Sequence, residues 1–143
     1  MIYSATTQGW HEYLQQQSVQ DVDLLVNLSS DPEQLSNAEF YRAYYLCRVI
    51  FRRMEHDYYQ FENGTFEAET WEAYVRSFRE DTFQNRAVRA MWELQSDYFD
   101  PKFAEYMQVV VREAGANPVP NLRRRFMEQL QQKKTEHGAD AAD

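Results

Sequence analysis

The sequence predicts an all-α protein, a helical bundle of about four to six helices packed around a long central helix at about residues 37–61. Three observations support this prediction. Apolar residues recur three or four positions apart along most of the chain, as they do on the buried face of an α-helix. Glycine and proline are scarce, with four of each in 143 residues. Aromatic residues form 15% of the chain, which is enough to build a core.

The clearest helix signal runs from Ser36 to Phe61. An apolar seam without a charge follows this segment within about 120° of arc. Its members are Phe40, Ala43, Tyr44, Cys47, Ile50, Phe51, Met54, Tyr58 and Phe61. Ser36 and Glu39 have the spacing of a capping box, and Asn63-Gly64 has the composition of a turn that ends a helix. We therefore expect this seam to be the spine of the core.

Shorter helices are predicted on both sides of the central one. Residues 5–28 have the pattern of one irregular helix or two short ones, and Asp31 would then cap a single turn that Pro32 opens. Beyond residue 64, we expect helices from residue 67 to a polar break at 82–85, from there to residue 97, and from Asp100-Pro101 to a stop at Gly115. Leu94 and Tyr98 are placed on the apolar face of the second of these helices.

Three tryptophans fall on three different predicted helices. They are Trp10, Trp71 and Trp92, and each lies on or beside an apolar seam. We expect them to join these helices to the central seam, because a buried aromatic side chain contributes more packing area than any aliphatic one.

The chain divides into three predicted regions. Residues 1–116 form the bundle domain. Residues 117–134 form an amphipathic C-terminal helix behind a hinge that contains two prolines, with Asn121 as its cap. Its apolar side is predicted to hold Leu122, Phe126, Met127 and Leu130, and its other side Arg123, Arg124, Arg125, Lys133 and Lys134. Residues 135–143 are predicted to be a disordered tail.

Charge and composition narrow the classes of function. The net charge of −8 argues against nucleic acid as a partner, so none is expected. A single cysteine, Cys47, cannot form an internal disulfide, which suits a reducing compartment. The chain has no run of 18 apolar residues, and its first residues lack the pattern of a signal peptide. We predict a cytoplasmic protein, or a membrane-associated one if an N-terminal anchor was removed.

The usual catalytic patterns are missing from the sequence. The three histidines lie in separate segments without a metal-binding spacing, and we expect no metal and no cofactor. Cys47 lies on the apolar seam, where a reactive thiolate is disfavoured. The sequence contains neither a nucleophile elbow nor a phosphate-binding glycine loop, so no catalytic residue is assigned. A non-enzymatic role is favoured, with an enzymatic bundle kept as an alternative.

Two surfaces are candidate binding sites. The first, called the Tyr/Arg flank, is a stripe beside the apolar seam of the central helix: Tyr41, Tyr45, Arg48, Arg52, Glu55 and Tyr59. Tyrosine and arginine are enriched at the energetic centres of protein interfaces, although an ordinary amphipathic border has the same pattern. The second is the basic patch Arg123, Arg124 and Arg125, which could contact phosphate, lipid headgroups or an acidic protein, or be a solvated helix face.

The order of several short motifs resembles a known group of proteins. The motifs are E-x-x-R at Glu39 and Arg42, G-x4-E-x-W at Gly64, Glu69 and Trp71, R-x-x-R-x-x-W at Arg86, Arg89 and Trp92, and Y-F-D-P-x-F from Tyr98 to Phe103. Over about residues 10–112 they resemble a group of small uncharacterised bacterial α-helical proteins, regarded as domains of unknown function. Members of that group often carry an N-terminal transmembrane helix, which is absent here. The resemblance supplies no known activity.

The function predicted from these observations is a non-catalytic protein-interaction or scaffolding module, with a protein or a second copy of the chain as its partner. One alternative is a small-ligand-binding or enzymatic bundle that uses the Tyr/Arg flank. Another is the soluble domain of a membrane-anchored protein, with membrane contact through the basic C-terminal helix or through an N-terminal anchor.

Overall fold

The computed structural model describes residues 22–140. Within this range all regular structure is helical, which confirms the predicted all-α class. The predicted helix over residues 5–28 is described only from residue 22, and its earlier part lies outside the described residues, as does Trp10. The elements are α2 (Val22–Ser30), η1 (Pro32–Gln34), α3 (Asn37–Glu62), α4 (Ala68–Glu80), η2 (Thr82–Gln84), α5 (Arg86–Gln95), η3 (Ser96–Tyr98), α6 (Pro101–Ala116) and α7 (Leu122–Asp140), where η denotes a 3₁₀ turn.

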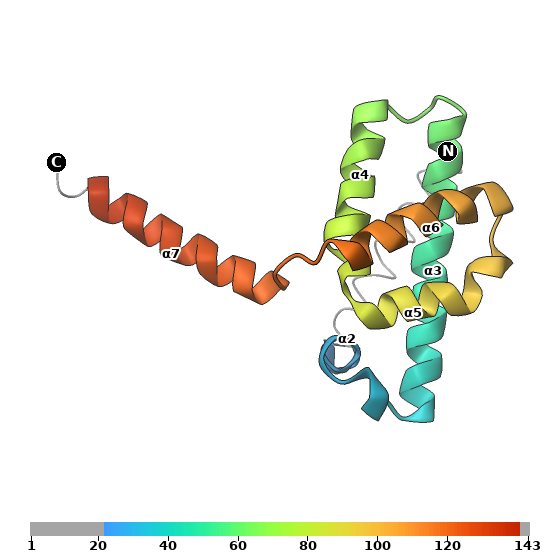
Figure 1. Cartoon of the computed structure of the whole chain (residues 1–143), viewed down its shortest axis with the longest axis horizontal. Helices are drawn as coiled ribbons and strands as arrows, with labels where there is room; N and C mark the ends of the chain where they lie inside the picture. Colours follow the sequence, from blue (N-terminus) through green and yellow to red (C-terminus); the bar gives the residue numbers. More distant parts are fainter. Residues whose placement is uncertain (1–21, 141–143) are drawn as a thin grey trace.

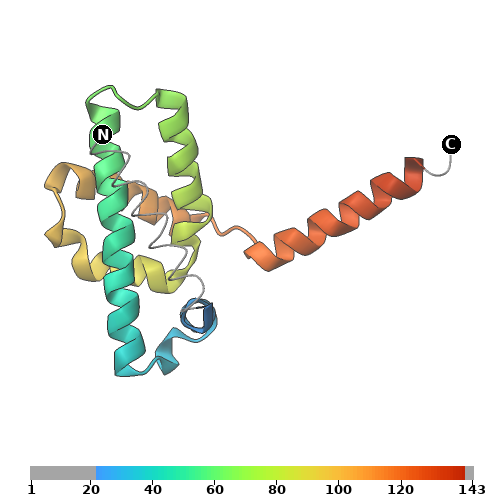
Figure 2. The same ribbon diagram turned by 180° about the vertical axis from the view of Figure 1, so that it is seen from behind.

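The long helix α3 is the axis of the bundle. It forms a hairpin with α4, and a second hairpin of α5 and α6 crosses over this pair (Figure 1). Seen from behind, α3 lies in front of both crossing helices, and α2 sits beside the end at which α3 begins (Figure 2). Helix α7 projects away from the bundle in both views. The predicted organisation around a central helix is thus confirmed.

Local signals define most of the helix ends. The Ser36 hydroxyl accepts from the Glu39 N–H at 3.1 Å, and the Glu39 carboxylate accepts from the Ser36 N–H at 3.0 Å, so the predicted capping box is formed. Gly64 has a φ of +75°, which a glycine adopts without a steric penalty, and it closes the turn after α3. The predicted cap at Asp31 is wrong in one respect, because its side chain makes no capping hydrogen bond.

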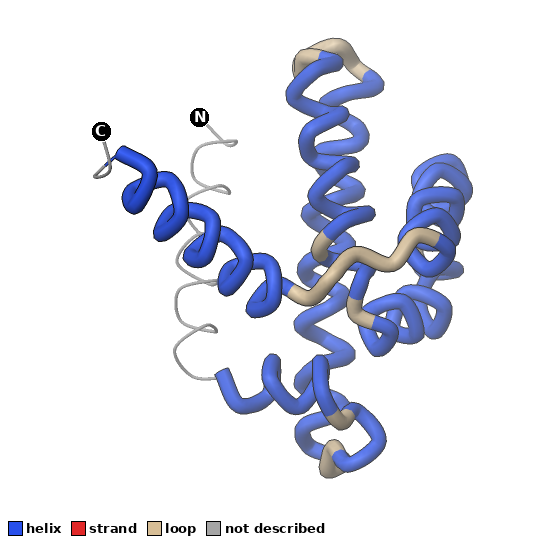
Figure 3. The backbone as a smooth tube through the Cα atoms, turned by 60° about the vertical axis from the view of Figure 1, so that its left-hand side comes forward, coloured by secondary structure: helices blue, strands red, loops and turns tan. Residues whose placement is uncertain are grey.

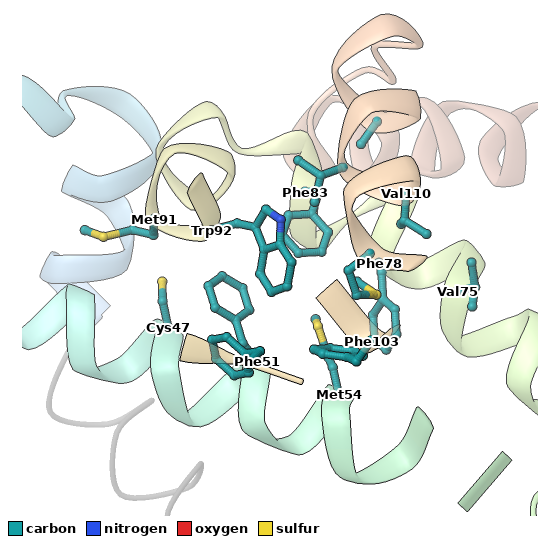
Figure 4. Packing of buried hydrophobic residues seen from close by; sticks show 14 of the residues in the cluster. Cys47, Phe51, Met54, Val75, Phe78, Phe83, Met91, Trp92, Phe103 and Val110 are labelled. Atoms are coloured by element: carbon teal, nitrogen blue, oxygen red, sulfur yellow. The ribbon is translucent and has the colours of Figure 1, made fainter. Parts of the chain in front are cut away.

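The predicted spine of the core is confirmed over most of its length. The buried members of the seam are Ala43, Cys47, Phe51, Met54 and Tyr58, and Figure 4 shows three of them facing the side chains of the other helices. The prediction that Phe40 belongs to the buried seam is wrong. This residue is 36% exposed, because α3 extends beyond the crossing hairpin at this end.

Trp71 and Trp92 join two aromatic clusters to the central helix, as predicted. The ring of Trp92 is fully buried and meets Phe51 edge to face at 5.2 Å between centroids, and its Nε1–H donates to Gln108. The ring of Trp71 stacks on Phe61 at 5.3 Å. Edge-to-face and offset contacts of this kind add about 0.5–1.5 kcal/mol each to the burial of the rings.

Several predicted details differ in the structure. Leu94 and Tyr98 were placed on the buried face but are 59% and 60% exposed. Tyr98 leaves that face because the chain departs from the α-helix after Gln95 and turns through η3, whereas Leu94 is still within α5 and lines an open hollow together with Phe40. Gly115 does not stop α6, which continues to Ala116. The predicted disordered tail is also wrong in part, since α7 continues through residues 135–140. The predicted polar break at residues 82–85 contains Phe83, which is fully buried. Its neighbours in the sequence are polar, so the sequence pattern did not identify it as a core residue.

The connector between α6 and α7 is held by one glutamine. Gln84 Nε2 lies 2.9 Å from the Arg79 carbonyl, 3.2 Å from that of Ala114 and 3.2 Å from that of Asn117, and its Oε1 accepts from the Val119 N–H at 2.8 Å. The connector, shown in tan in Figure 3, therefore leaves the bundle along a defined path. The Asn121 side chain then caps α7 as predicted, accepting from the Arg124 N–H at 2.8 Å.

Candidate functional site

The Tyr/Arg flank of α3 lies at the surface, beside the η3 corner. Tyr41, Tyr45 and Tyr59 are exposed, whereas Arg48 and Glu55 are half-buried. The structure adds two side chains that the sequence analysis placed in the core, namely Leu94 and Tyr98. Exposed aromatic rings therefore lie beside the charged groups, with the Tyr98 ring centroid 5.0 Å from the Arg48 Cζ atom.

Arg48 is the centre of this surface. Its Nε–H donates to Gln95 Oε1 at 2.8 Å, and its guanidinium also donates to the Tyr44 hydroxyl. Its Cζ atom lies 5.1 Å from the ring centroid of Tyr44, 5.9 Å from that of Tyr45 and 5.0 Å from that of Tyr98. An arginine within about 6 Å of ring centroids is attracted by their π faces.

Arg52 is committed to contacts within the protein. Its guanidinium pairs with Glu55 at 3.2 Å, donates to the Tyr98 carbonyl at 3.0 Å and lies 4.4 Å from the Phe99 ring centroid. The other oxygen of Glu55 accepts from the Asp100 N–H at 2.9 Å. These contacts fasten α3 to the start of α6, so this half of the flank has a structural role.

Tyr59 extends the same network to the cap of α6. The Tyr59 hydroxyl is bonded to the Asp100 carboxylate, and this bond raises the pKa of the tyrosine. The pKa of Asp100 is lowered, first by the Phe103 N–H and then by Tyr59 and Lys102. Asp100 therefore stays ionised at neutral pH as the N-cap of α6.

Gln95, Leu94 and Tyr98 were missed as parts of this site. Gln95 is completely buried and bonds both Arg48 and the Tyr44 carbonyl, and nothing in its sequence position distinguishes it from a solvent-exposed glutamine. The Asp100-Pro101 helix start was a usable signal for Tyr98, because a helix opening there requires α5 to end several residues earlier. Side chains just beyond that end then leave the buried face.

Helix α7 carries the second candidate surface. Leu122, Phe126, Met127 and Leu130 are exposed on it, with Leu122 at 67%. In the basic patch, Arg123 and Arg124 are exposed and Arg125 is half-buried, with an Nε that has no hydrogen-bond partner within the described residues. The predicted separation into an apolar and a basic side is wrong. At about 100° per residue, Arg123, Lys133 and Lys134 fall among the apolar side chains.

Two hollows border α2 and α5. The smaller, of about 240 Å³, is bounded by Leu28, Leu35, Phe40, Met91 and Leu94 among others. The larger, of about 650 Å³, lies at the root of α7, and Cys47 is among its lining residues. Burial raises the pKa of the Cys47 thiol to about 12, so this group remains a protonated thiol and does not serve as a nucleophile at neutral pH.

Two features are absent from residues 22–140. No group of three or more His, Cys, Asp or Glu side chains in this range is arranged to hold a metal ion. Within the same range, no helix combines the length and the apolar composition that crossing a membrane requires.

Comparisons with protein-family models, with curated proteins and with solved structures find no match for this chain. The resemblance to the group of small bacterial helical proteins therefore stays a prediction.

Proposed function

We propose that this protein is a non-catalytic interaction module that associates with itself through α7. The observation that carries the proposal is the exposure of four large apolar side chains on a helix that projects from the bundle: Leu122, Phe126, Met127 and Leu130. Large apolar side chains that cluster on an exposed helix are typical of interaction sites. The bonds of Gln84 to the connector direct α7 away from its own bundle, so a second molecule is the natural cover for these side chains.

Charge favours the bundle of a second copy as the surface that α7 contacts. Residues 122–134 contain five Lys and Arg and one acid, whereas residues 22–121 contain 17 Asp and Glu against 10 Lys and Arg. Two α7 helices would repel each other along their basic segments. A basic helix of one copy on the acidic bundle of another is attractive instead, and opposite potentials of this kind both speed and orient association.

Light scattering coupled to size-exclusion chromatography over a dilution series tests this proposal. We expect the wild-type mass to rise above that of a monomer as concentration increases, and the Phe126→Glu chain to remain monomeric. The matched control is Val109→Glu, which changes an exposed apolar side chain on α6 and should associate like the wild type. Added salt should weaken association, because it screens exposed charges beyond about 10 Å at about 0.1 M.

Two outcomes would reject the proposal. One is a wild-type chain that is monomeric at every concentration. The other is association that Phe126→Glu leaves unchanged. Vesicles containing phosphatidylserine form a separate arm: a monomeric chain that binds them through α7 would place this helix at a membrane surface instead.

A further inference from the structure

Arg48 is a half-buried cation that has no acidic partner among residues 22–140. Its guanidinium bonds the neutral groups of Gln95 and Tyr44, and no carboxylate of residues 22–140 lies within 4.0 Å of it. An arginine side chain has five N–H donors, and these two hydrogen bonds use only two of them. Charges that a protein buries fully are usually paired with an opposite charge. Arg48 is half-buried among aromatic rings with no carboxylate beside it in residues 22–140, so its charge is open to a carboxylate from a partner.

The unused part of the guanidinium faces a surface that is rich in aromatic rings. Tyr45 and Tyr98, whose rings lie 5.9 Å and 5.0 Å from the Arg48 Cζ, are both more than half exposed. Tyrosine rings exclude water from a neighbouring contact and also offer a hydroxyl to a partner. This combination of an arginine and exposed tyrosines is the composition of an interface hot spot.

An apolar hollow lies close to this cation. Phe40 and Leu94 are among the residues that line the hollow of about 240 Å³. The ring of Phe40 stacks on Tyr44 at 6.4 Å between centroids, and Tyr44 in turn contacts Arg48. The Tyr44 side chain therefore separates the hollow from the Arg48 guanidinium. A short segment of a partner could place an apolar side chain in the hollow and pair a carboxylate with the guanidinium.

We propose that Arg48 binds a carboxylate, and that this face takes an acidic segment of a partner protein in which an Asp or Glu stands near an apolar side chain. The carboxylate would meet the open edge of the guanidinium between Tyr45 and Tyr98, and the apolar side chain would enter the hollow beside Phe40. A carboxylate suits the site better than a phosphate group. Among the described members of the Tyr/Arg flank, Arg48 is the uncompensated cation, since Arg52 is paired with Glu55, and the chain as a whole is negative.

The probe is a random-peptide display library selected on the full wild-type chain. We expect the enriched peptides to contain Asp or Glu near Leu, Ile or Phe. In fluorescence anisotropy, the best such peptide should bind the wild-type chain roughly ten-fold more tightly than a control peptide with Gln in place of Glu does. The same peptide should bind the wild-type chain roughly ten-fold more tightly than it binds the Arg48→Gln variant. Arg76→Gln, which changes an exposed arginine on α4 outside both candidate surfaces, is the matched control and should bind like the wild type.

A second variant keeps the test decisive if Arg48→Gln does not fold. Tyr98→Ala removes an exposed ring and leaves the backbone carbonyl that Arg52 uses, so it should fold and bind the peptide roughly two- to five-fold more weakly. The measurements are repeated in the Phe126→Glu chain, so that loss of self-association through α7 is distinguished from loss of this site.

Three results would overturn the proposal. They are a selection that enriches no acidic peptide, an acidic peptide that binds Arg48→Gln as well as the wild type, and displacement of the peptide by inorganic phosphate at a much lower concentration than by acetate. The last would assign the site to phosphate groups.

Discussion

Arg48 and Gln95 are joined by a hydrogen bond of 2.8 Å that links the middle of α3 to the last residue of α5. Gln95 is completely buried, and its amide also donates to the Tyr44 carbonyl. The pair therefore holds the arginine in position while satisfying a polar group inside the bundle. The same bond that stabilises the crossing of α3 and α5 also directs the guanidinium toward the exposed tyrosines.

Replacing Gln95 with Leu should destabilise the protein by about 1–3 kcal/mol, because it leaves the Arg48 Nε–H without its buried acceptor. Urea unfolding followed by circular dichroism measures this loss. Gln129→Leu, at an exposed position of α7, is the control and should change stability by less than about 0.5 kcal/mol. Equal stability of Gln95→Leu and the wild type would show that the bond has no structural role.

Replacing Trp92 with Ala should lower the free energy of unfolding by about 3–5 kcal/mol. The substitution opens a cavity between Phe51 and Phe103 and leaves Gln108 without the indole donor. Guanidinium unfolding monitored by circular dichroism is the measurement. Leu94→Ala on the same helix is the control, since its exposed side chain should contribute little. A Trp92→Ala chain that unfolds at the wild-type midpoint would contradict the described core.

The capping box predicts a pH effect from Glu39. Hydrogen bonds from Ser36 lower the pKa of this glutamate below its ordinary value of 4.5. Its ionised form therefore stabilises the folded state above the ordinary pKa, and this contribution is lost as pH falls through the lowered value. Glu39→Gln should weaken the decline in melting temperature between about pH 7 and about pH 3. Ala38→Ser, at the adjacent exposed position, should retain the wild-type decline.

Removing the Gln84 side chain should release the connector to α7. Gln84→Ala removes the acceptor of the Val119 N–H and the donor that reaches three carbonyls, which should cost about 1–3 kcal/mol. Hydrogen exchange followed by mass spectrometry should show faster exchange at Val119. Gln132→Ala, exposed on α7, serves as the control. Unchanged exchange at Val119 would mean that the connector is held by its prolines alone.

Local signals were sufficient for much of the fold. The capping box of Ser36 and Glu39, the turn at Gly64 and the Asp100-Pro101 start all depend on residues a few positions apart, and all three are formed. Periodicity also identified the buried part of the α3 seam. It failed at Phe40 because a pattern along one helix does not show where the neighbouring helices end.

The candidate binding surface was predicted only in part. The members of the Tyr/Arg flank share one helix, so their spacing was enough to group them. The pairs Arg48–Tyr44 and Arg52–Glu55 are local, but the contacts of the two arginines with Gln95 and with the Tyr98 carbonyl join residues 47 and 46 positions apart, and these could not be predicted from spacing. The role of Gln95 was not predicted, because it depends on the packing of α5 against α3. Tyr98 was predicted to lie on the buried face, and its exposed position depends on the turn at η3.

The sequence by itself determined the helical class, the long central helix and most helix ends, because these depend on short-range hydrogen bonds and on the period of apolar residues. Only the tertiary structure decided which face of each helix is covered. The crossing of α5 and α6 over α3 buries Gln95 and exposes Tyr98, and the path of the connector leaves the apolar residues of α7 uncovered. Burial depends on which elements meet in space, and a one-dimensional pattern records only that a helix has a face to bury.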